Sequence, residues 1–203
     1  MSTYFEICSL PPHLNIDTAA LENSFYALSR KLHPDRFAGR PAAEQEAAVA
    51  ESSHLNDAYR TLKDPIARTE YLLKLEGIEL EEQSSAATAA ARASGTAKKQ
   101  VVPEDLLEEA FELNMQLEEM RAAKKMGEDD PQLRQDLLAA RTTFEGKLAA
   151  TDADLRNHWS RWDTAVDAND PAARVAARDG MVALLNRRRY LRNLVRDVNE
   201  ALE

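Results

Sequence analysis

The sequence has very little cysteine, no glycine-rich loop and no long apolar run. Cys8 is the only cysteine, so the chain cannot form an internal disulfide or a zinc site of the Cys-x-x-Cys type. Nucleotide binding is not predicted, because no glycine-rich phosphate loop is present. No apolar run approaches the ~20 residues of a membrane span, and the first residues lack the basic and apolar regions of a signal peptide. We therefore expect a cytoplasmic protein without a membrane segment.

The chain also lacks a positive balance of charge. Its 35 Asp and Glu residues outnumber 26 Lys and Arg residues, which gives a formal net charge of −9. Nucleic-acid binding needs a basic face that contacts phosphates, so protein partners are favoured instead. The histidines at positions 13, 33, 54 and 158 lack the i, i+4 spacing of a helical metal site. No bound metal or cofactor is predicted.

What the sequence does contain is an all-α pattern, with apolar side chains at helical spacing and no strand-like alternation. A short helix from Tyr4 to Cys8 is predicted to pack on a following pair of antiparallel helices. Asp17 is expected to cap the first helix of this pair. The apolar positions of the pair are Leu21, Phe25, Leu28 and Leu32 in its first helix and Leu55, Ala58, Tyr59 and Leu62 in its second.

The tripeptide His33-Pro34-Asp35 stands in the polar loop between these two helices. Pro34 disfavours a helical conformation at His33, so the first helix should end there with His33 extended. Taken alone, the tripeptide could be a helix stop followed by a capping Asp. An acid–base pair is disfavoured, because a short loop supplies neither a nucleophile nor a water-excluding pocket. Four basic side chains surround the loop: Arg30, Lys31, Arg36 and Arg40. They would either steer an acidic partner towards the loop or simply stabilise the C-terminal end of the helix through its macrodipole.

Two signals divide the chain. Asp64-Pro65 ends one helix and starts another, unusually apolar helix that runs to Gly77 and should pack against both the first domain and the C-terminal part of the chain. Residues 81–100 contain almost no large apolar side chain, so a linker or a marginal helix is expected there. We predict a first domain over residues 1–76, a linker over 77–102 and an antiparallel three-helix bundle over 103–203.

The bundle is predicted from three long apolar stripes. The first is Leu106, Ala110, Leu113, Leu117 and Met120; the second is Leu133, Leu137, Ala140, Phe144 and Leu148, resuming at Leu155, Trp159 and Trp162; the third is Leu184, Leu191, Leu194, Val198 and Leu202. Gly127 and Pro131 separate the first two helices, and Asp170-Pro171 starts the last. Thr151-Asp152 either breaks the second helix or is merely exposed on it.

A second apolar stripe lies about 100° round the first bundle helix from its core stripe. It consists of Leu107, Phe111 and Met115, interleaved with Glu108, Glu112 and Glu119. Apolar residues ringed by carboxylates suit a protein-binding face. Alternatively, a helix of a three-helix bundle simply buries a wide apolar face. The two interpretations differ in whether Leu107 and Phe111 are exposed.

The first ~65 residues resemble a J-domain through the tripeptide and the aromatic and apolar positions around it. Together with the run Arg68-Thr69-Glu70-Tyr71-Leu72-Leu73 and the C-terminal bundle, the whole chain resembles the HscB family of co-chaperones for iron–sulfur cluster assembly. The resemblance implies that the J-domain engages an HscA-type (DnaK-type) seventy-kilodalton heat-shock chaperone, and that the bundle holds an IscU-type scaffold protein. It also implies that this chain is not an enzyme, because the ATP chemistry belongs to the partner.

The resemblance assigns functional residues at two places in this sequence. The chaperone contacts would be His33, Pro34, Asp35, Arg30, Lys31 and Arg36, and the scaffold contacts would be Leu107, Phe111, Glu112 and Tyr190. Three departures from the family pattern stand out. Glu108 occupies a position that tends to be apolar, the linker looks longer than usual, and no cysteine-rich N-terminal extension precedes the J-domain, which favours a bacterial-type protein.

Two rival interpretations remain open at the level of sequence. A general J-domain protein for unfolded clients is disfavoured, since the chain has no Gly/Phe-rich segment and no zinc-binding cysteines. A structural helical adaptor with a degenerate J-domain is disfavoured by the intact tripeptide and its basic flank.

Overall fold

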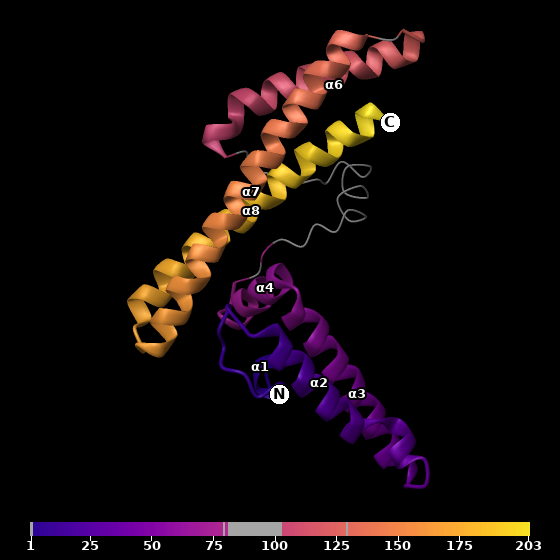
Figure 1. Cartoon of the computed structure of the whole chain (residues 1–203), viewed down its shortest axis with the longest axis vertical. Helices are drawn as coiled ribbons and strands as arrows, with labels where there is room; N and C mark the ends of the chain where they lie inside the picture. The colour runs from indigo at the N-terminus through magenta and orange to yellow at the C-terminus, as the bar shows by residue number, and fades with distance from the viewer. Residues whose placement is uncertain (1, 79, 81–102, 129) are drawn as a thin grey trace. The chain divides into compact units, whose positions relative to one another are not determined.

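The computed structural model describes residues 2–78, 80, 103–128 and 130–203, and over these ranges the chain is helical without strands (Figure 1). The predicted all-α class is therefore confirmed. The elements, in chain order, are α1 (Tyr4–Ile7), α2 (Thr18–Leu32), the 3-10 helix η1 (Pro34–Phe37), α3 (Ala42–Lys63), α4 (Pro65–Leu75), the 3-10 helix η2 (Glu104–Leu106), α6 (Leu107–Met126), α7 (Pro131–Asp167) and α8 (Pro171–Leu202).

The chain divides into two compact units, and the division differs from the predicted domains. Unit 1 holds Met1–Leu80 together with His158–Asp179, and unit 2 holds Glu81–Asn157 together with Gly180–Glu203. Residues 158–179, the joined ends of α7 and α8, are named the tip. The tip groups with the N-terminal residues because α7 bonds there to the segment ahead of α2. The predicted linker lies largely outside the described residues.

In unit 1, α2 and α3 lie side by side and antiparallel, with α1 and α4 against α3 (Figure 1). Asp17 caps α2 as expected, because its carboxylate accepts hydrogen bonds from the N–H groups of Ala19 (2.9 Å) and Ala20 (3.2 Å). The predicted stripes form the core between the helices: Leu21, Leu55, Ala58 and Leu62 are buried, and Phe25, Leu28, Leu32 and Tyr59 are half-buried.

The α4 helix begins and ends as the sequence predicts. The Asp64 carboxylate accepts the Ala67 N–H at 2.7 Å, and Pro65 occupies the first helical position, where it costs no hydrogen bond. At the other end, Gly77 adopts φ 79°, and the Ile78 N–H donates to the Leu73 carbonyl at 2.9 Å. Arg68 is buried on this helix, and its guanidinium donates to the Leu62 carbonyl at the end of α3. That burial lowers the pKa of Arg68.

Unit 2 is built on the predicted first stripe, which begins with Leu106 of η2 and continues along α6, and its five residues are all buried in a core with side chains of α7 and α8. The α7 helix is unbroken, and neither expectation for Thr151 holds. This side chain is buried, and its hydroxyl donates to the Lys147 carbonyl within the helix at 2.8 Å. In α8 the prediction of Leu184 as a core residue is wrong, because Met181 and Leu185 are buried there and Leu184 is half-buried. Leu184 stands seven residues before Leu191, and the 3.6-residue period of a helix drifts by about 20° relative to that spacing.

Candidate functional site

The His33-Pro34-Asp35 loop is exposed, and its backbone is fixed by local bonds. His33 is extended (φ −60°, ψ 127°), as predicted for a residue before proline. The next residues form η1, in which the Arg36 N–H donates to the His33 carbonyl at 3.0 Å. The Gln45 side chain of α3 donates to the Arg40 carbonyl at 2.8 Å and ties the end of the loop to α3. The loop therefore presents its side chains from a defined backbone.

His33 and Asp35 contact each other but remain open to solvent. His33 Nδ1 lies 3.3 Å from the Asp35 amide nitrogen and 3.4 Å from Asp35 Oδ2. One nitrogen cannot serve both contacts, because it accepts the amide proton when neutral and donates to the carboxylate when protonated. The Asp35 side chain is 88% exposed, so most of its acceptor capacity is available to a partner. A water-excluding pocket of the kind that catalysis needs does not surround this pair.

The basic flank predicted from the sequence gathers around this loop. Arg30 and Lys31 stand in the last turn of α2, and Arg36 lies in η1. Arg36 donates to the Arg30 carbonyl at 3.3 Å, which holds its guanidinium over the end of α2. The six residues assigned to chaperone binding thus occupy one continuous segment, the C-terminal end of α2 with η1.

A second candidate surface lies on α6 in unit 2. Leu107, Phe111 and Met115 are 51%, 69% and 61% exposed, so the second apolar stripe faces solvent and is not part of a wide buried face. These three residues are named the α6 ridge. Glu112 is exposed as well, but it lines a groove of 420 Å³ between α6 and α7, next to Gln116 and Asp136. Phe111 and Glu112 therefore present their side chains to different sides of α6.

Tyr190, the fourth residue assigned to scaffold binding, has a different environment. It is 8% exposed and belongs to the core of unit 2 with Leu106 and Ala110. Burial raises the pKa of its hydroxyl. Its direct contact with a partner stays a prediction, since the structure places the ring in the core and the α6 ridge at the surface.

Contacts between the tip and the N-terminal segment are the part of unit 1 that sequence reasoning missed. Trp162 is buried, as predicted for a core residue, and its indole N–H also donates to the Pro12 carbonyl at 3.0 Å, a contact that was not predicted. The neighbouring Asp163 accepts hydrogen bonds from Leu14 and Asn15, 149 and 148 residues earlier in the chain. No local pattern predicts that the segment ahead of α2 pairs with one polar position on a distant helix.

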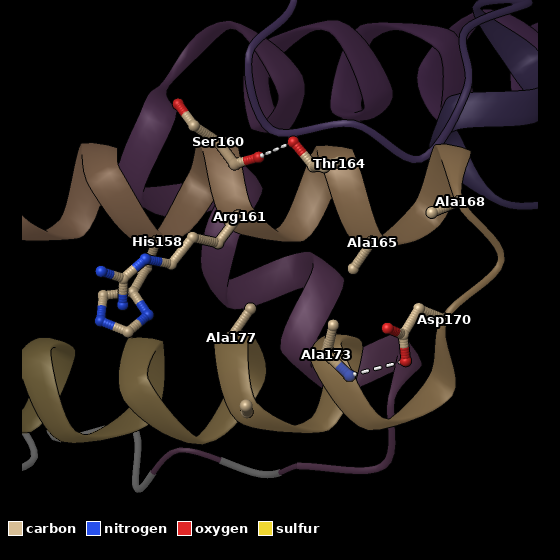
Figure 2. Close-up of a pocket in the computed structure, with 10 residues that line it drawn as sticks. His158, Ser160, Arg161, Thr164, Ala165, Ala168, Asp170, Ala173 and Ala177 are labelled. Atoms are coloured by element: carbon tan, nitrogen blue, oxygen red, sulfur yellow. Dashed lines mark hydrogen bonds between the residues drawn. The ribbon is translucent and has the colours of Figure 1, made fainter.

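A groove of 470 Å³ runs between α7 and α8 within the tip (Figure 2). Alanine side chains contribute half of its lining, and His158 and Arg161 of α7 also line it. Asp170 is already engaged as the cap of α8, because its carboxylate accepts the N–H groups of Ala172 and Ala173, each at 3.0 Å. Thr164 is engaged as well, since its hydroxyl donates to the Ser160 carbonyl at 2.8 Å. Two of the polar groups lining the groove thus serve the helices themselves.

The described residues contain no group of three His, Cys, Asp or Glu side chains that could hold a metal ion. No helix among them is long and apolar enough to cross a membrane. The predicted absence of a metal or cofactor remains a prediction.

A helical hairpin with an exposed His-Pro-Asp loop at its turn and a short helix packed on it defines a J-domain. Residues 3–71, about a third of the chain, match the DnaJ domain family.

The resemblance to HscB is confirmed by individual relatives. The HscB homolog of Neisseria meningitidis serogroup B is 52% identical over 79 residues, which is 39% of this chain and 48% of the relative. That of Vibrio cholerae is 46% identical over 77 residues, 38% of this chain and 45% of the relative. The chain thus spans about half the length of the curated relatives it matches. The crystal structure of the human co-chaperone HscB matches with a TM-score of 0.56 and 25% identity, covering 98% of this chain and 82% of that one.

Proposed function

We propose that this chain is an HscB-type co-chaperone that binds an IscU-type iron–sulfur scaffold protein and delivers it to an HscA-type heat-shock chaperone, whose ATPase it stimulates. The observation that carries the proposal is the exposed His-Pro-Asp loop with its basic flank, on a DnaJ domain whose relatives are named HscB co-chaperones. In this proposal the chain itself is not an enzyme, and a cytoplasmic location without a bound cofactor stays a prediction.

The chaperone contact rests on the chemistry of the loop. The exposed Asp35 carboxylate can accept charge-assisted hydrogen bonds from a basic side chain of the chaperone, and Pro34 limits the conformations that must be frozen on binding. Arg30, Lys31 and Arg36 complement an acidic surface and raise the rate of encounter. His33 orients the loop through its contacts with Asp35.

The scaffold contact rests on the α6 ridge. A row of exposed apolar side chains on one helix provides the i, i+4 anchors that a helix offers to a partner groove. The surrounding glutamates would form the polar rim of such an interface. Glu108, next to Leu107, is charged at a position that tends to be apolar in the family. We therefore expect it to reduce the apolar area of the interface, and to lower the affinity for the scaffold without abolishing binding.

The decisive experiment for the J-domain is steady-state ATP hydrolysis by an HscA-type chaperone, with and without an IscU-type scaffold. We expect the wild-type chain to stimulate hydrolysis cooperatively with the scaffold, and Asp35→Ala to remove the stimulation, because the carboxylate is the proposed acceptor. Glu46→Ala, an exposed carboxylate on α3, is the matched control and should behave as wild type. Equal stimulation by wild type and Asp35→Ala would overturn the proposal.

The scaffold contact is tested by titrating an IscU-type protein against Phe111→Ala. A central aromatic anchor contributes about 2 kcal/mol, so affinity should fall roughly 30-fold. Met126→Ala removes an exposed apolar side chain at the far end of the same helix and should leave affinity unchanged. If both variants bind the scaffold like wild type, the α6 ridge is not the contact.

A general J-domain protein for other clients is the alternative. It would stimulate a DnaK-type chaperone through Asp35, but an IscU-type scaffold would add nothing to the rate. The same ATPase assay therefore separates the two functions.

A further inference from the structure

The segment ahead of α2 is held by one carboxylate of the tip. Asp163 Oδ1 accepts the Leu14 N–H at 2.6 Å, and Asp163 Oδ2 accepts the Asn15 N–H at 2.9 Å. The Asn15 side-chain amide also donates to Oδ2, at 2.8 Å. Three donors from two adjacent residues thus converge on the two oxygens of a single side chain.

Further contacts of the tip surround Asp163 within unit 1. The Trp162 indole donates to the Pro12 carbonyl at 3.0 Å, and His13 Nε2 lies 2.9 Å from Asp167 Oδ1. On the α8 side, the Arg174 guanidinium stands 5.1 Å from the centre of the Trp162 ring and donates to Glu76, the residue after α4, at 2.8 Å. Within unit 1, the tip therefore contacts the N-terminal residues at two places, ahead of α2 and directly after α4.

These bonds satisfy groups that the first domain leaves unpaired. Leu14 is fully buried, and a buried N–H without an acceptor is costly. Asn15 stands two residues before Asp17, the N-cap of α2, so the carboxylate of Asp163 fixes the chain where α2 begins. The same helix carries Arg30 and Lys31 in its last turn.

We infer that the J-domain of this chain is completed by a segment distant in sequence: the tip is required to hold residues 12–15, and Asp163 is the positioning residue for the start of α2. The sequence match ends at residue 71, so this requirement extends the working unit beyond the DnaJ domain itself. The inference concerns the conformation of unit 1 and is independent of the proposed function.

The experiment uses the full chain and its single thiol. Cys8 is buried at the end of α1, ahead of α2, so its reaction rate with a disulfide reagent such as dithionitrobenzoate reports opening of this part of unit 1. Asp163→Ala should speed the Cys8 reaction, and amide exchange at Leu14 and Asn15, about tenfold or more, because hydrogen bonds to a charged group are lost. Exchange in the core of unit 2, at Leu117 and Leu137, should not change.

Matched variants separate positioning from general destabilisation. Asp154→Ala, at an exposed position of the same helix, should leave all rates at wild-type values, and Asp163→Glu should restore part of the protection because it keeps the acceptor. Should Asp163→Ala fail to fold, Asn15→Ala, which removes only the side-chain donor, should give a smaller change in the same direction. Rates for Asp163→Ala equal to those for Asp154→Ala, or an equal acceleration in the unit 2 core, would overturn the inference.

The ATPase assay adds an independent readout. We expect Asp163→Ala to raise the concentration of this chain that gives half-maximal stimulation, with less effect on the maximal rate, because a misplaced α2 still carries Asp35. If the wild-type chain stimulates no chaperone, the proposed function fails, whereas the thiol and exchange rates still decide the inference.

Discussion

At the scale of single residues, a tyrosine pair attaches the first helix to the fourth. The Tyr4 and Tyr71 rings stack at 4.3 Å between centres, and the Tyr4 N–H donates to the Tyr71 hydroxyl at 2.9 Å. The hydroxyl thus satisfies one of the free N–H groups at the start of α1. Burial is the main cause that raises the pKa of Tyr71.

Replacing Tyr71 with Phe should affect stability in a pH-dependent way. At pH 7 we expect a loss of about 1 kcal/mol in the free energy of unfolding, because the Tyr4 N–H loses its acceptor. Because the folded-state pKa is raised, the tyrosine contributes fully below its unfolded pKa near 10, and the contribution is lost as the pH rises further. Wild type should therefore lose stability more steeply above pH 10 than Tyr71→Phe.

Urea unfolding at a series of pH values measures this difference. Tyr26→Phe, at an exposed tyrosine of α2, is the control and should behave like wild type throughout. An equal alkaline slope for wild type and Tyr71→Phe would contradict the expectation.

At the scale of elements, the turn between α7 and α8 depends on one residue in the left-handed conformation. Asn169 has φ 50°, and the next N–H, from Asp170, donates to the Ala165 carbonyl at 2.9 Å. This is the six-to-one bond that closes a helix end of the Schellman type. Asp170 then caps α8, so two adjacent residues end one long helix and start the next.

The effect of a substitution at Asn169 on the free energy of unfolding should depend on how well the new residue adopts a positive φ, and not on the loss of the side-chain amide. Asn169→Val should lower the free energy of unfolding by about 1–2 kcal/mol, because a β-branched residue fits poorly at positive φ. Asn169→Gly should change it by only a few tenths, since glycine adopts this conformation freely. Thermal unfolding measured by circular dichroism compares the two, and equal losses would point to a role for the side chain.

The sequence predicted those features of the elements that depend on neighbours along the chain. Caps such as Asp17 and Asp64, the helix break at His33 and the buried stripe of α6 result from local rules of capping and periodicity. The burial of Thr151 was not predicted, because a hydroxyl that bonds within its own helix gives no signal of burial.

The candidate sites also differ in how far the sequence predicts them. The His-Pro-Asp loop and the α6 ridge were predicted as exposed candidate surfaces because the residues of each lie on one continuous segment. The role of Asp163 was not found, since its partners are nearly 150 residues away and carboxylates on a long helix are usually solvated. Tyr190 was assigned to a partner surface but lies in the core. A position on α8 can be assigned to the core or to the surface only when the packing of α8 against α6 and α7 is known.

At the scale of the whole molecule, α7 and α8 each belong to both units. The covalent backbone of two helices thus passes from one compact unit to the other without interruption. Unfolding one unit would fray helices that the other unit needs, so cooperative behaviour of the chain is expected.

A core substitution in unit 2 tests this coupling. Leu113→Ala leaves a cavity in a fully packed site and should cost about 2–5 kcal/mol. Both tryptophans, Trp159 and Trp162, lie in unit 1, so their fluorescence reports a distant part of the chain. We expect the urea midpoint from tryptophan fluorescence to fall together with that from circular dichroism. A fluorescence midpoint unchanged from wild type would show that the units unfold separately.

The burial of Cys8 has a consequence for metal chemistry. This thiol is the only one in the chain, it is 1% exposed, and burial raises its pKa, so it is held as the protonated, uncoordinating form. Thiolates are the ligands that iron and its sulfide clusters prefer. The folded chain therefore offers no accessible sulfur anion that could coordinate a thiophilic metal ion.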